Sequence, residues 1–377
     1  MKLSTTFSER SPQRQFPSIT SFVGETNAGK STIVLSLMYL SKRQDTIVNL
    51  EAPVPAASTG DSITQSTTGE VNLYLDPETF GTESPALYAD CDGMVGTEPI
   101  AAQQQKEWVE HGKHYLVKTR DGRVMDRRTA VNEVYPRFLY IFSDVVCFVM
   151  RNHKAWADSA LKLLDWSMIG AQSAINQQAL PALVIVLNGP SIEDESWISD
   201  SQDCVTNSFF SAVDKEITRN ATIQEHASRV GTTAFREELF EKSFSSVYVH
   251  SIPLQGYKTL GTTDIMERQY SKLSKRLQLD SARVQHLRQK AWNRFDVREL
   301  SLVSRFAFEH LASGNREPFD FDKCRKELSI PTSLEDHFAS FFRHCLKNNM
   351  GQRLEATAAV LSSSILLSSY RTQGRSK

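Results

Sequence analysis

The sequence has 377 residues, of which 40% are hydrophobic and 23% are charged, and its formal net charge at pH 7 is −1. This composition is typical of a folded soluble protein and excludes the collagen-like and disordered classes. The near-neutral charge gives no general attraction to nucleic acid or to an anionic membrane, so we expect no nucleic-acid partner. The length suits two domains, or one domain with large insertions.

The cysteines and the N-terminus indicate a cellular compartment. The five cysteines are widely spaced and odd in number, and no two of them form a C-x-x-C pattern. This argues against a disulfide framework and a zinc site and favours free thiols. Residues 1–15 are polar, lack the apolar core of a signal peptide and are predicted to be disordered. No segment reaches the roughly 18 apolar residues of a membrane span. We therefore expect a cytoplasmic protein without a transmembrane segment.

A phosphate-binding motif follows the first predicted strand. Residues 18–23, SITSFV, predict a β-strand, and the apolar residues of GKSTIVLSLMYLSK recur at helical spacing. Between them, the pattern G-x-x-x-x-G-K-[ST] of a P-loop is met by Gly24, Gly29, Lys30 and Ser31. Strand, glycine-rich loop and helix is the order that a P-loop requires.

Each residue of this motif has a chemical role in a P-loop. The glycines let successive N–H groups point at phosphate oxygens, Lys30 neutralises the β and γ charge, and the Ser31 hydroxyl binds Mg²⁺. The anion lies at the positive end of the following helix. We expect the nucleotide to contact the whole loop and the first helical turn, which comprise Gly24, Glu25, Thr26, Asn27, Ala28, Gly29, Lys30, Ser31 and Thr32.

A second carboxylate is needed on the far side of the metal ion. EVNLYL and PALYAD predict two strands joined by a turn, and Asp90 ends the second strand. Gly93 completes a D-x-x-G pattern in which the glycine N–H can meet a γ-phosphate. Asp92 has similar chemistry and could take the role of Asp90. Thr68, with Thr67 as the alternative, lies just before EVNLYL, where GTPases place a threonine that completes the magnesium shell.

Further along the chain, strands and helices alternate. DVVCFVM, ALVIVLN and SSVYVHSIP predict buried strands, and residues 156–175 predict an amphipathic helix. Residues 44–68 predict a long loop, and about 101–130 a surface insertion. The pattern favours a three-layer α/β domain of the P-loop NTPase class over residues 16–255, with a mostly parallel central sheet. Residues 256–377 predict a helical region, and we expect either that the chain is a fragment or that its last helix docks elsewhere.

These motifs together resemble the G domain of the dynamin superfamily, especially its guanylate-binding-protein and atlastin branch. GETNAGKST looks like the dynamin-type P-loop, QSTTGEVNLYL is similar to the switch I of guanylate-binding proteins with one residue fewer, and LYADCDG resembles their LLDTEG. The resemblance implies a GTP-binding α/β domain followed by helices. It also implies nucleotide-dependent dimerisation and remodelling of a membrane or a partner.

Several positions depart from that family. GTPases end a later strand in N-K-x-D, whose aspartate selects guanine, but here Asn188 is followed by Gly189 and by Ser191 at the aspartate position. Asp194 can serve instead if the loop bulges, and Ser251 occupies the place of the base-contacting loop after the last strand. Asn27 stands where the guanylate-binding branch carries a catalytic arginine.

The sequence therefore leaves more than one function open. The first hypothesis is a Mg²⁺-dependent GTPase that acts as a switch or self-assembling machine with slow unassisted hydrolysis, in which Lys30, Thr68 and Gly93 act on the phosphate and Ser31, Thr68 and Asp90 hold the metal. The alternative is a nucleotide-binding regulatory module with negligible turnover, whose helical region engages a protein partner. An ATPase is a third reading, because the base-reading motif is degenerate.

Overall fold

The structure is a computed structural model, and it describes most of the predicted strands and helices. The described residues are 15–42, 55, 71–91, 93, 122–125, 130–151, 156–175, 177, 179–189, 202–217, 238–253, 261–291, 293–314, 317–324 and the scattered positions 343, 355, 358–359 and 362–363. The predicted loop over 44–68, apart from Pro55, and most of the predicted insertion over 101–130 lie outside these residues.

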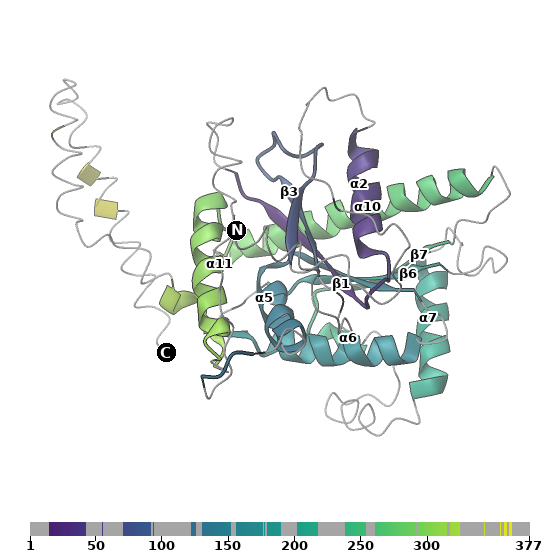
Figure 1. Cartoon of the computed structure of the whole chain (residues 1–377). Coiled ribbons are helices and arrows are strands. Elements are labelled where there is room, and N and C mark those ends of the chain that lie inside the picture. Colours follow the sequence, from purple (N-terminus) through teal and green to yellow (C-terminus); the bar gives the residue numbers. More distant parts are fainter. Residues whose placement is uncertain are drawn as a thin grey trace. The chain divides into compact units, whose positions relative to one another are not determined.

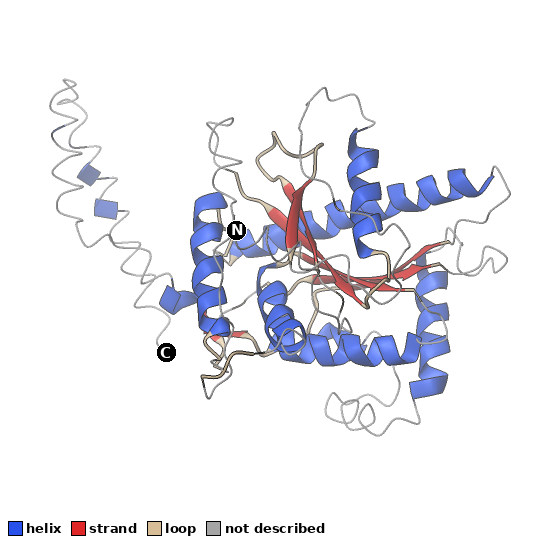
Figure 2. Ribbon diagram, viewed as in Figure 1, coloured by secondary structure: helices blue, strands red, loops and turns tan. Residues whose placement is uncertain are grey.

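A mostly parallel sheet forms the centre of the fold (Figure 2). Within the described residues, six strands are ordered β2-β3-β1-β4-β6-β7, and only β2 runs antiparallel, against β3. The strands are β1 (Ser18–Gly24), β2 (Asn72–Leu75), β3 (Ala86–Asp90), β4 (Val145–Met150), β6 (Ala182–Asn188) and β7 (Val247–Ile252). The predicted α/β fold class is confirmed.

Helices cover both faces of the sheet (Figure 1). Helices α2 and α10 lie on one face, and α5, α6 and α7 lie on the other. The helices are α2 (Lys30–Lys42), α5 (Tyr135–Phe142), α6 (Trp156–Ala171), α7 (Gln202–Ile217), α9 (Glu238–Glu241), α10 (Gly261–Lys290) and α11 (Val297–Ala312), with a π-helical turn, η1 (Ala130–Val134), before α5. The result is the expected three-layer arrangement.

The predicted helix over residues 156–175 is too long. It ends at Ala171, and the following β5 (Ala174–Ile175) pairs with β8 (Phe319–Asp320) in a separate two-stranded sheet. The Phe319 N–H donates to the Ser173 carbonyl at 2.8 Å. A partner distant in sequence therefore satisfies backbone groups that would otherwise have continued the helix.

Strands β4 and β6 are buried almost throughout. Every residue of β4 is buried, and so is every residue of β6 except Asn188. Their near-continuous apolar sequences suit strands of a parallel sheet that is covered on both faces. Val145 pairs with Ala182 and Met150 with Leu187, so the carboxyl ends of the two strands lie level.

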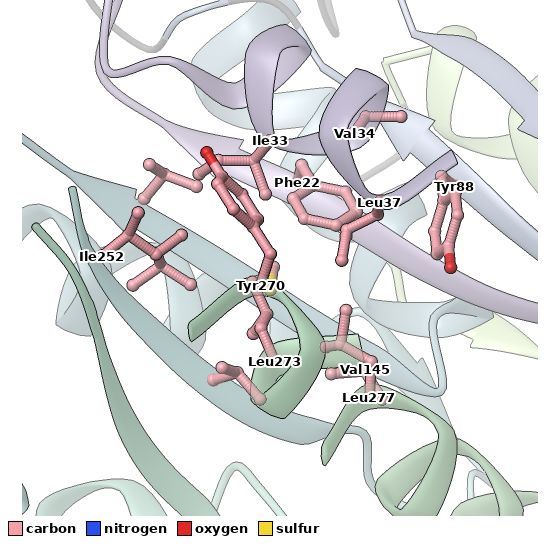
Figure 3. Close-up of a cluster of buried hydrophobic side chains, with 14 of the residues drawn as sticks. Phe22, Ile33, Val34, Leu37, Tyr88, Val145, Ile252, Tyr270, Leu273 and Leu277 are labelled. Atoms are coloured by element: carbon pink, nitrogen blue, oxygen red, sulfur yellow. The ribbon is translucent and has the colours of Figure 1, made fainter. Parts of the chain in front are cut away.

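The long helix α10 shares one hydrophobic core with α2 and the sheet (Figure 3). Its thirty residues place Tyr270, Leu273, Leu277 and Val284 among the buried side chains. Phe22 of β1 and Ile33, Val34, Leu37 and Met38 of α2 belong to the same cluster. The first helix of the predicted C-terminal helical region thus packs directly on the sheet.

The chain separates into two compact units, Met1–Phe319 and Asp320–Lys377. The sheet and the helices that cover it belong to the first unit, and few residues of the second are described. Across the described part of the chain, no helix combines the length and the apolar character needed to cross a bilayer.

A buried ion pair fastens α10 at the amino edge of the sheet. Arg288 Nε lies 2.8 Å from Asp144 Oδ1, and both side chains are almost fully buried. Asp144 Oδ2 accepts hydrogen bonds from the Ile19 N–H at 2.9 Å and from Gln285 Nε2 at 2.8 Å, and Arg288 Nη2 donates to the Ser143 carbonyl at 2.8 Å. Burial raises the pKa of Asp144, and the Arg288 charge opposes that rise.

We expect Arg288→Ala to lower the free energy of unfolding by about 3–5 kcal/mol, because it leaves the Asp144 carboxyl buried without its cation. Urea denaturation followed by circular dichroism measures the loss. The matched control is Arg305→Ala, since Arg305 pairs with Glu309 at 3.8 Å on the exposed face of α11 and should cost at most about 1 kcal/mol. Equal losses for the two variants would contradict this account.

His250 makes the stability of the fold depend on pH. It is buried in β7, its Nε2–H donates to the Gln269 carbonyl of α10 at 3.0 Å, and burial lowers its pKa to about 4. The unfolded chain binds the proton with a pKa of about 6.5, so the stability contributed by neutral His250 is complete above that pH and is lost as the pH falls towards 4.

At pH 5 this loss should reach about 2 kcal/mol relative to pH 8. Denaturation curves at pH 5, 6, 7 and 8 measure it. In His250→Gln the fall in the free energy of unfolding between pH 8 and pH 5 should shrink by that amount. The control is His286→Gln, at an exposed position of α10, and it should show the same fall as the wild type. A His250→Gln variant with an unchanged slope would show that His250 does not carry the dependence.

Candidate functional site

The loop between β1 and α2 depends on two glycines with unusual backbone angles. Gly24 has φ 139°, and a Cβ there would lie 2.3 Å from the Val149 carbonyl oxygen of β4. Gly29 has φ 91°, and its Cβ would lie 2.4 Å from Asn188 Nδ2. Side chains at either position would be strained and would clash. The two glycines of the sequence motif are therefore required by close packing against β4 and β6.

Lys30 begins α2 and bends back over the loop. Its side chain is buried, and its ammonium donates to the Glu25 carbonyl at 2.7 Å and to the Gly24 carbonyl at 3.4 Å. A cation held at the mouth of a glycine loop, beside the N-terminus of a helix, gives the loop a concentration of positive charge. The structure thus places the Lys30 cation at the loop, and its contact with phosphate stays a prediction.

Ser31 and Asp90 come together between α2 and β3. The Ser31 hydroxyl donates to Asp90 Oδ2 at 2.7 Å, and both side chains are buried. The pairing of β1 with β3 sets this distance, because Asp90 lies opposite Phe22 just before the loop. Burial together with the Asp90 carboxylate raises the pKa of the nearby Tyr74 to about 12.

One hydroxyl and one carboxylate form only part of a magnesium site. Among the described residues, no group of three or more His, Cys, Asp or Glu side chains could hold a metal ion by itself. Magnesium usually keeps waters and is bound by one or two protein ligands together with phosphate oxygens. Ser31 and Asp90 fit that donor set, and the remaining ligands would come from water and a bound phosphate chain.

The glycine of the D-x-x-G pattern packs against the loop. A Cβ on Gly93 would lie 2.2 Å from Thr26 Oγ1 and 2.5 Å from Thr26 Cα. The Thr26 hydroxyl is buried and has no hydrogen-bond partner among the described residues. Gly93, three residues after the end of β3, therefore reaches the loop in the structure, and only glycine leaves room for that approach.

Asn188 closes the loop from the side of β6. Its Nδ2 donates to the Ala28 carbonyl at 2.7 Å. Asn27, the residue before Ala28 in the loop, has φ 61°. Ser251, which was expected in a loop after the last strand, lies within β7 with its side chain buried. The strand continues to Ile252, whose carbonyl accepts from the Gly189 N–H at 2.8 Å, so the base-contacting loop cannot begin at Ser251.

Two contacts to the loop were not predicted from the sequence. Glu25 Oε1 accepts hydrogen bonds from Ser159 Oγ at 3.0 Å and Lys162 Nζ at 2.9 Å, both on α6. Arg151, directly after β4, donates from Nη1 to the Asn27 carbonyl at 3.2 Å. The signal in the sequence that could have indicated Arg151 is its position directly after a buried strand, at the edge of the sheet where ligands of open α/β folds bind.

The remaining predicted site residues are placed as follows. Thr32 is exposed in the first turn of α2. Thr68 and Asp194, with the alternatives Thr67 and Asp92, lie outside the described residues. The structure thus brings together the loop, Lys30, Ser31, Asp90, Gly93 and Asn188.

Comparisons with known proteins add little to this geometry. No family model matches the sequence, and no curated protein matches it. Structure comparison finds 163 matching chains. One of them is described as the signal recognition particle receptor SRb-GTP/SRX complex from Chaetomium thermophilum, with 13% identity and a TM-score of 0.33; the match covers 67% of this chain and 99% of that chain. A score this low carries no functional argument, so the function is argued from the site.

Proposed function

We propose that this chain binds a nucleoside triphosphate with Mg²⁺ at residues 24–31, the loop and the start of α2, and hydrolyses it slowly. The observation that carries the proposal is the 2.7 Å hydrogen bond between Ser31 and Asp90. It joins the hydroxyl that begins the helix to the carboxylate that ends the neighbouring strand, at the side of a loop whose cation is Lys30. A magnesium ion bound there would neutralise phosphate charge, and Lys30 would hold the β and γ oxygens.

We take GTP as the nucleotide and the dynamin-superfamily G domain as the type. The motif resemblance and the contact of Gly93 with Thr26 support this choice. Asn188 supports it as well, because it stands at the base-reading position and bonds to the loop. Gly189 and Ser191 replace the lysine and aspartate of N-K-x-D, so ATP is the competing nucleotide.

We further propose that hydrolysis is slow without help. Asn27 occupies the loop position at which guanylate-binding proteins supply a catalytic arginine, and loss of such an arginine removes about three to five orders of magnitude of rate. A nucleotide-dependent homodimer could supply the missing charge. If it does not, the chain is a regulatory module whose helical region, residues 256–377, engages a cytoplasmic protein partner.

Lys30→Ala should weaken nucleotide binding by about 10- to 100-fold, because it removes charge-assisted hydrogen bonds to phosphate. Titration of fluorescent GTP, GDP and ATP analogues with Mg²⁺ measures it, with Lys275→Ala on the exposed side of α10 as the control. Failure of the wild type to bind any of the three would overturn the proposal. Equal affinity for ATP and GTP would remove its guanine part.

Ser31→Ala should abolish most of the magnesium dependence of binding while the loop and Lys30 remain. The measurement is the ratio of affinities for GTP in Mg²⁺ and in EDTA. The matched control is Ser36→Ala, since Ser36 lies on the same helix and its hydroxyl donates to the Thr32 carbonyl. A Ser31→Ala protein with the wild-type ratio would refute the assignment of Ser31 to the metal.

A further inference from the structure

Arg151 lies against the nucleotide loop and belongs to the site. Its Nη1 donates to the Asn27 carbonyl at 3.2 Å, which is the sole hydrogen bond or ion pair of its side chain among the described residues. The side chain is exposed, so a 3.2 Å bond to a neutral oxygen restrains it weakly. Glu25, the acidic residue of the loop, is bound to Lys162 and does not hold Arg151.

The strand order separates the two sides of the loop. Asp90 ends β3, on one side of β1, and its bond to Ser31 marks that side as the place for the metal and the γ-phosphate. Arg151 follows β4 and Asn188 ends β6, both on the other side of β1. Ligands of open α/β sheets lie across the carboxyl ends of the strands. The nucleoside should therefore extend over the ends of β4 and β6.

Arg151 and Asn188 hold consecutive carbonyls of the loop. The first bonds to Asn27 and the second to Ala28, at 3.2 and 2.7 Å. Asn188 is the start of the base-reading motif, and the residue after it, where that motif has a lysine, is Gly189. No side chain at position 189 can cover the base or cap the loop, and Arg151 stands beside the loop on that same side.

We propose that Arg151 is a base-stacking residue of the nucleotide site, supplied by β4 in place of the lysine that is missing after Asn188. This inference rests on the proposed function and adds a residue that binds the base. The planar guanidinium can keep its bond to the Asn27 carbonyl while its face covers an aromatic ring, an arrangement that suits arginine better than lysine. Because every purine presents such a face, Arg151 raises affinity for GTP and ATP alike.

A compound without a base distinguishes stacking from phosphate binding. Inorganic tripolyphosphate carries the phosphate chain of GTP and ATP but no base or ribose. In isothermal titration with Mg²⁺, Arg151→Ala should lower the affinity for GTP and for ATP by about 3- to 30-fold. Its affinity for tripolyphosphate should stay within about twofold of the wild-type value. Arg151→Lys should fall between the two proteins for both nucleotides. Arg305→Ala is the matched control, because Arg305 is an exposed arginine on α11.

The other outcomes contradict the inference in different ways. Equal weakening of tripolyphosphate and nucleotides would assign Arg151 to the phosphates. Unchanged binding of all three would make it a solvated side chain. The proposed function fails separately, if wild-type protein binds none of the three or if Lys30→Ala binds them as well as the wild type does.

Discussion

The candidate site depends on the contact between Gly24 and Val149. The backbones of β1 and β4 pass so close at this point that a Cβ on Gly24 would reach within 2.3 Å of the Val149 oxygen. The chain can therefore leave β1 only through a glycine with positive φ, and the loop begins at the middle of the sheet rather than at its edge. With β3 on one side and β4 on the other, Asp90 and Arg151 flank the loop as a consequence of strand order.

Local patterns in the sequence predict the strands and the loop well, because each depends on nearby residues. The apolar runs of β4 and β6 and the helical spacing after Lys30 need no distant partner to be recognised. The helix over 156–175 was predicted too long for the opposite reason. Its last residues pair with Phe319–Asp320, and no local pattern announces a partner so far along the chain.

In the candidate site too, residues set by a local motif could be predicted from the sequence, and contacts made by residues distant in sequence could not. Lys30, Ser31 and Asp90 are predicted from spacing, since the motifs fix which residue types stand at which intervals, and the structure places Ser31 against Asp90. Arg151 and the bonds from α6 to Glu25 were missed because they are made by single polar side chains brought close by strand order. Ser251 was expected after the last strand, but β7 continues through it to Ile252. Sequence alone also could not show that α10 completes the core of the sheet.

The ion pair between Asp144 and Arg288 lies at the end of the sheet opposite to the candidate site. Asp144 accepts from the N–H of Ile19 near the start of β1, whereas the loop leaves from Gly24 at the end of that strand. One end of the sheet therefore anchors the long helix, and the other carries the polar residues of the loop. Because the anchor and the loop lie at opposite ends of β1, a substitution in the loop removes none of the hydrogen bonds that Asp144 accepts. A substitution among the polar residues of the loop can therefore change what the loop binds without removing the bonds that hold α10 on the sheet.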